Sequence, residues 1–131
     1  MAVGLATVAY ANKVLDHMHR AVASTAPAGN FVRLHTGDPG AAGTANGSAN
    51  TTRVAVTFAA ASAGAIAQTG TAPSWATWAA GTETITHISV WDASTGGTFL
   101  YSIQLTQSKQ MTNGDTLNLT NTSVSLAPLA A

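Results

Sequence analysis

Charged side chains are scarce in this 131-residue chain: they make up 8% of it, with five Lys or Arg against five Asp or Glu. An average globular domain carries about 25%, and soluble monomers use that charge to stay in solution. A surface of Thr, Ser, Ala, Asn and Gly instead suits a protein packed against copies of itself or against a partner. The balanced charge and the lack of a basic stripe disfavour nucleic-acid binding. They also leave no cationic face for a membrane surface.

Cysteine is absent altogether, which excludes disulfides and thiolate metal sites. No apolar run approaches the roughly 20 residues of a membrane span. The N-terminus lacks a basic stretch followed by an apolar block, so we expect no signal peptide. The length predicts one domain, large enough to bury a core without staples.

Clustered catalytic groups are also lacking, so we expect no enzyme, no catalytic residues and no cofactor. The carboxylates are scattered, and no Gly-x-Ser-x-Gly nucleophile elbow occurs. The carboxylates are Asp16, Asp38, Glu83, Asp92 and Asp115.

Histidine raises the question of a metal site, which the spacing does not support. His17 and His19 are two residues apart, so on a helix they point about 200° away from each other. His35 and His87 fall on separate expected strands, with no carboxylate at ligand spacing. We therefore predict surface or hydrogen-bonded histidines and no metal.

What the chain does contain begins with a helical pattern over residues 2–24. Apolar side chains recur there at spacings of three and four, as one helix face requires; they are Leu5, Val8, Ala11, Leu15, Met18 and Val22. The stripe ends at Ser24-Thr25-Ala26-Pro27, so we place the helix and its breaker in residues 1–26 and the rest of the domain in 27–131. The helix is expected to lie across a sheet or, alternatively, to contact a neighbouring subunit through Leu15, Met18 and Val22.

A short strand and an abrupt turn follow the helix. Residues 31–35 alternate, with Val32 and Leu34 on one side, as in a half-buried strand. Asp38, Pro39 and Gly40 then predict a tight turn in which Asp38 accepts from nearby backbone amides. Small residues continue to Thr52, and we expect an adaptable loop that offers a contact surface, with Asp38 and Pro39 as candidate interaction residues.

Everything after this loop has a β pattern. Strands are expected at 53–59, 66–69, 83–92, 98–105, 116–119 and 122–126, with turns at 94–97 and 113–115. Short strands with no interleaved helix predict a mainly β chain: an antiparallel, jelly-roll-like β-sandwich with one N-terminal α-helix. Trp75 and Trp78 are candidate interaction residues, because an indole pair can stack on sugars. Core or subunit-interface packing is the favoured interpretation of the pair.

The stretch Leu34-His35-Thr36-Gly37-Asp38-Pro39-Gly40 resembles a "leucine-His-Thr-x-Asp-Pro-Gly" element that follows an N-terminal helix in small structural proteins of tailed bacteriophages. The similarity continues in order along the chain: through residues 53–58 and 86–97 to Ser108-Lys109 and residues 114–117. Members of that family are virion structural, minor tail, tail-fibre or head-decoration proteins. The resemblance implies a β-sandwich in the virion and carries over no catalytic residue.

Three hypotheses follow from the resemblance and the composition. The first is a capsid decoration protein on the outer capsid surface, made in the bacterial host cytoplasm, which binds the major capsid protein and copies of itself. The second is a minor tail or tail-fibre component that binds host glycans through the Trp-bearing loops. The third is an enzyme such as a cell-wall hydrolase, against which the missing carboxylate pair counts.

Overall fold

The computed structural model describes residues 3–126. Residues 1–2, at the start of the predicted helical segment 1–26, and residues 127–131, at the end of the predicted β segment 27–131, lie outside the described residues. The described chain is mainly β, with antiparallel strand pairs and an N-terminal helix, which confirms the predicted class. Its elements are η1 (Thr7–Ala11), α1 (Asn12–Arg20), β1 (Phe31–His35), β2 (Val54–Ala55), β3 (Thr57–Phe58), β4 (Ala65–Thr69), β5 (Ser74–Trp75), β6 (Glu83–Trp91), β7 (Phe99–Met111), β8 (Leu117–Asn118) and β9 (Ser123–Ser125).

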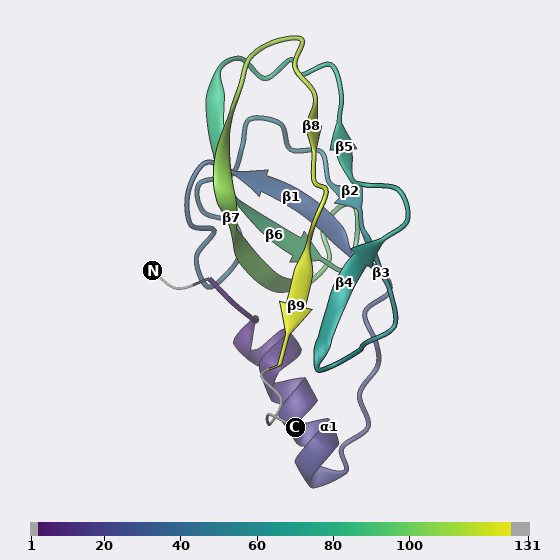
Figure 1. Cartoon of the computed structure of the whole chain (residues 1–131). Coiled ribbons are helices and arrows are strands. Elements are labelled where there is room, and N and C mark those ends of the chain that lie inside the picture. The colour runs from purple at the N-terminus through teal and green to yellow at the C-terminus, as the bar shows by residue number, and fades with distance from the viewer. Residues whose placement is uncertain (1–2, 127–131) are drawn as a thin grey trace.

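The strands form two layers. One is a four-stranded sheet of order β2-β1-β6-β7. The other consists of β3-β4-β9 and β5-β8, and Figure 1 shows the chain that runs from β8 into β9 passing in front of β1 and β6. Two backbone hydrogen bonds, from Gln68 N to Thr122 O and from Leu119 N to Pro73 O, extend the β4–β9 and β5–β8 pairings toward each other along the connection between β8 and β9.

The expected strand over residues 53–59 changes layers at Val56. Its first part, β2, pairs with β1, and its second part, β3, pairs with β4. The Val56 side chain is buried, and its backbone N donates to Asn30 O at 2.9 Å. This one residue therefore carries the chain from one layer to the other while its side chain stays in the core.

The hairpin of β6 and β7 is longer than the sequence pattern predicts. β7 runs on to Met111, through a polar stretch expected to lie outside a strand, because that stretch pairs with the start of β6. The pairing register shifts between Ile85 and His87. Simple alternation would place Ile85 and Ile88 on opposite faces of β6. The shift in register allows both side chains to be fully buried in one cluster.

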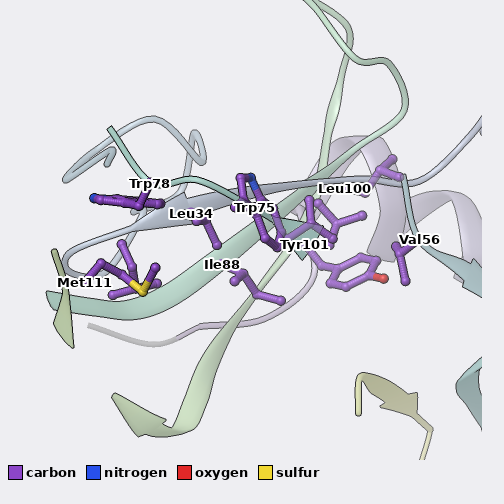
Figure 2. Packing of buried hydrophobic residues seen from close by; sticks show 11 residues of the cluster. Leu34, Val56, Trp75, Trp78, Ile88, Leu100, Tyr101 and Met111 are labelled. Atoms are coloured by element: carbon purple, nitrogen blue, oxygen red, sulfur yellow. The ribbon is translucent and has the colours of Figure 1, made fainter. Parts of the chain in front are cut away.

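The core lies between the two layers and includes both tryptophans of the 73–80 segment. Trp75 is 3% exposed and Trp78 is 1% exposed, and Figure 2 shows both with Leu34, Ile88 and Met111. Each indole N–H donates to a backbone carbonyl, of Thr52 for Trp75 and of Gly81 for Trp78. Buried and satisfied in this way, the indoles are core residues, and the interpretation of Trp75 and Trp78 as sugar-stacking surface residues is wrong.

Candidate functional site

The N-terminal helix is shorter than predicted and stands away from the sheets. After the π-helical turn η1, α1 ends at Arg20, because Ala21 takes a left-handed conformation with φ of 54°. None of the residues of α1 is buried, and in Figure 1 the helix extends beyond the strands. The expectation that the helix lies across a sheet is therefore wrong for α1.

The helical segment is attached to the β-sheets through the residues that precede and begin it. Ala6 N donates to Leu100 O at 2.7 Å, and Ser102 N donates to Gly4 O at 2.9 Å, so the arm before η1 pairs with β7. Tyr10 then packs edge-on against Tyr101, with ring centroids 6.0 Å apart. These contacts hold the start of the helical segment and leave most of α1 without a partner among residues 3–126.

Most of the predicted apolar stripe is exposed in this arrangement, although its first residue, Leu5, packs against the core. Val8 is 76% exposed, Leu15 57% and Met18 69%, and Val22 is exposed as well. Isolated helices shorter than about 12–15 residues are marginal in water, and most helical stability in proteins comes from packing an apolar face. The short length of α1, nine residues, and its exposed apolar face are therefore typical of a helix that packs in an interface.

The charges of α1 lie beside the stripe rather than within it. Arg20 and Asp16 form an exposed ion pair one turn apart, with 2.9 Å between Nη1 and Oδ1. Such a pair contributes a few tenths of a kcal/mol to the helix. Two copies can therefore bring Leu15 and Met18 together without burying a charge.

The Asp-Pro-Gly turn forms as predicted but is not a contact surface. Asp38 Oδ1 accepts from Gly40 N at 2.8 Å, as the sequence pattern indicates. Pro39 is fully buried, so its assignment as an interaction residue is wrong. Asp38 Oδ2 is also buried, and the turn therefore serves the fold.

The loop after the turn is tied down rather than adaptable. Thr36 N donates to Asn46 O, and Ser48 N donates to Leu34 O. At its far end, Ser48 Oγ donates to one carboxylate oxygen of Glu83, and Ala49 N donates to the other at 3.2 Å. Because its backbone groups are already used within the fold, the expectation of a flexible contact loop is wrong.

A buried hydrogen-bond network that the sequence analysis did not predict connects the same loop to β1 and β6. His35 is fully buried and lies 2.8 Å from Ala45 O through Nδ1 and 2.7 Å from Ser89 Oγ through Nε2. Trp91 Nε1 donates to the same Ser89 Oγ at 2.8 Å. Strand alternation could have indicated that His35 shares a face with Ser89 and Trp91, but not that a loop would cover this face.

Within residues 3–126, no group of three or more His, Asp or Glu side chains could hold a metal ion. His17 Nδ1 instead lies 3.2 Å from Val22 O at the end of the helix. No helix in this part of the chain is long and apolar enough to cross a membrane.

Comparison with known protein families gives a match over nearly the whole chain. The family described as "Podophage GP4 fiber I protein gp80" has a family model that matches residues 5–127. That range takes in the helix, the turn and both layers of strands. No curated protein matches the chain.

Proposed function

Because the chain belongs to the podophage GP4 fiber I protein family, a family of phage virion structural proteins, we propose that it is a non-enzymatic fibre subunit that assembles with copies of itself through the helix α1. The family supports the tail-fibre alternative better than capsid decoration with the major capsid protein as partner. The observation that carries the assembly step is the exposure of Leu15 and Met18 on α1, with Val22 also exposed just beyond the end of the helix.

The energetics favour a partner for this stripe. Burying a Leu or Met side chain contributes about 1.5–3 kcal/mol relative to leaving it exposed. In the single chain neither Leu15 nor Met18 obtains this gain, since more than half of each side chain remains exposed. Contact between helices would stabilise the association and the helix itself.

The chemistry of the stripe fits a second copy of the chain. A two-fold dimer forms when a patch can meet the same patch of a second copy, and like charges facing each other would oppose that contact. Leu15, Met18 and Val22 are uncharged, and the nearest ion pair is already satisfied within one helix. The association is therefore expected to depend weakly on salt.

Sedimentation of the full chain over a range of concentrations tests this function. The wild type should form an oligomer, and the double variant Leu15→Gln, Met18→Gln should sediment as a monomer with an unchanged β circular dichroism spectrum. The matched control, Lys13→Gln with Arg20→Gln, alters the same helix outside the stripe and should still assemble. A monomeric wild type at every concentration, or an oligomer unaffected by the stripe variant, would contradict the proposal.

A further inference from the structure

Two arginines face each other on the side of the four-stranded sheet that points away from the core. The pairing of Val32 with Val54 sets the register of β1 and β2. One position further along, the same register brings Arg33 opposite Arg53, the residue just before β2. Val32 is buried in the core, so the side chain of the next residue, Arg33, lies on the outer face. Like charges directly opposite each other destabilise an antiparallel pair, and the fold accepts that repulsion here.

No carboxylate within residues 3–126 forms an ion pair with either arginine. The one ion pair among these residues lies on α1. Burial and, after it, the charge of Arg33 lower the pKa of Arg53, and the charge of Asp92 opposes them. The Asp92 carboxylate is already engaged, because its Oδ1 accepts from Thr98 N at 2.6 Å. Two positive charges therefore share the neighbourhood of one occupied carboxylate.

The guanidinium of Arg53 is held in a fixed position. Its Nη1 donates to Ala93 O at 2.9 Å and to Gly96 O at 2.6 Å. Its Cζ lies 4.1 Å from the centre of the Trp91 ring, a stacking contact that favours the cation. These contacts use Nη1 and one face of the group. Nε and Nη2 make no hydrogen bond within the described part of the chain and can donate to a ligand.

The guanidinium of Arg33 is positioned by the loop that follows β1. A Cβ at Gly47 would lie 2.5 Å from Arg33 Nη2, so this group rests against the loop where the absence of a side chain leaves room. Arg33 Nε is buried without a partner. Nη1 and Nη2 keep accessible surface and make no hydrogen bond within residues 3–126. The loop therefore leaves only the terminal N–H groups of Arg33 free to meet a ligand.

Two fixed guanidiniums with free N–H groups and no acceptor between them suit a negatively charged ligand. Arginine N–H groups form paired hydrogen bonds with carboxylates and phosphates, whose oxygens match the geometry of the guanidinium. We propose that Arg33 and Arg53 together bind an oxyanion, the carboxylate or phosphate group of an acidic ligand. An anion between them replaces one repulsion by two attractions. The site lies on the sheet and not on α1, so the inference goes beyond the proposed fibre function and does not depend on it.

NMR titrations of the full chain with sodium phosphate and with sodium acetate test the site, at neutral pH and at an ionic strength held constant with sodium chloride. At least one of the two anions should shift the backbone amides of Arg33, Gly47 and Arg53. Phosphate binding alone identifies a phosphorylated ligand, and acetate binding alone identifies a carboxylate ligand. Binding of neither anion would overturn the proposal.

The variant Arg33→Gln should weaken the observed binding about tenfold or more, because a charged hydrogen-bond partner is lost. The matched control Lys109→Gln removes the same charge from an exposed position on β7 and should bind as the wild type does. Equal affinity in the wild type and Arg33→Gln would overturn the site. An equal loss in Lys109→Gln would also overturn it, since net charge alone would then account for the binding.

Thermal unfolding separates a binding role of Arg33 from a structural one. In sodium chloride alone, Arg33→Gln should melt at the same temperature as the wild type or higher, because it removes one of two facing charges and breaks no described hydrogen bond. The anion that binds should raise the melting temperature of the wild type and leave that of Arg33→Gln unchanged. A lower melting temperature of the variant in chloride would assign the residue to the fold and overturn the proposal.

The variant Gly47→Ala tests the geometry, since it keeps both positive charges. Gly47 does not have a left-handed backbone, so alanine should preserve the fold while its Cβ displaces the Arg33 guanidinium. Anion binding should weaken, and wild-type affinity would contradict a site built by the loop. The assembly variant Leu15→Gln with Met18→Gln should bind the anion as the wild type does. Loss of assembly and loss of anion binding can therefore be observed separately, and either proposal can fail alone.

Discussion

His35 Nε2 and Ser89 Oγ lie 2.7 Å apart, diagonally across the β1–β6 pair, in a position that no water reaches. The Ala45 carbonyl can only accept, so the proton of the imidazole sits on Nδ1 and Nε2 accepts from the Ser89 hydroxyl. Ser89 Oγ in turn accepts from Trp91 Nε1. Every group in this chain of hydrogen bonds is satisfied while His35 is neutral.

Acid should therefore destabilise the fold through His35. Burial lowers the pKa of His35 below its ordinary value of 6.5, against the opposing effect of the Ala45 carbonyl. The unfolded chain then binds a proton at a higher pH than the folded chain, so stability rises with pH in this window. The contribution of His35 is complete above about pH 6.5 and is lost as the pH falls toward the lowered folded pKa.

Urea unfolding at about pH 7.5 and about pH 5 measures this effect. The wild type should lose free energy of unfolding at the lower pH, and His35→Gln should lose less. His19→Gln, an exposed control, should behave as the wild type does. Equal pH dependence in the wild type and His35→Gln would contradict the assignment.

The substitution Ser89→Ala should cost about 2–6 kcal/mol of unfolding free energy, the sum for two buried groups left without a partner. It leaves both His35 Nε2 and Trp91 Nε1 buried without a partner, at about 1–3 kcal/mol each. Ser102 lies directly opposite Ser89 in the β6–β7 pair and makes one long bond, 3.4 Å from Gly4 N. The same change at Ser102 should cost less than about 1 kcal/mol, and equal losses in denaturant titrations would refute the role given to the network.

Two glycines with similar backbone angles should respond differently to alanine. Gly43 has φ of 70°, and a Cβ there would overlap the Phe99 ring, whereas Gly81 has φ of 80° and open space around it. Gly81→Ala should cost about 1–2 kcal/mol for the left-handed backbone alone. Gly43→Ala adds about 1–3 kcal/mol of overpacking. Thermal unfolding of the pair measures the difference, and equal melting temperatures would contradict the packing of the loop on Phe99.

Trp78→Ala should lower the free energy of unfolding by about 3–5 kcal/mol, because it empties a core site. Val8→Ala, which removes apolar atoms from an exposed site, should stay within about 0.5 kcal/mol of the wild type under conditions where the chain is monomeric.

Tryptophan fluorescence gives a second measurement of the core assignment. All three indoles are buried, so emission should be blue-shifted and resist quenching by acrylamide, and ready quenching would contradict the core assignment.

The strands were predictable where alternation alone decides the outcome. Val32 and Leu34 point inward as the pattern over residues 31–35 requires, and the turn at Asp115 forms with its backbone N donating to Thr112 O. Alternation failed where the pairing is irregular, because the shift beside Ile85 depends on the partner strand β7. The pattern over residues 53–59 was likewise correct as a β signal and silent about the change of layers at Val56.

Long-range contacts explain why the loop and the helix differ from their predicted arrangement. The loop was expected to be adaptable because its sequence is rich in small residues, yet Glu83, 35 positions from Ser48, holds its end. Helical periodicity correctly identified the stripe of Leu15 and Met18. It could not show that the helix would leave the sheets, since an apolar face has the same spacing whether the body or another chain covers it.

The position of the helix between the arm and β1 has a mechanical consequence. A load applied to α1 reaches the body through two routes, the arm paired with β7 and the connection that leads into β1. β1 has β2 on one side and β6 on the other. A force directed along β1 therefore acts in shear. It loads the hydrogen bonds on both edges of the strand at the same time, and they do not open one after another.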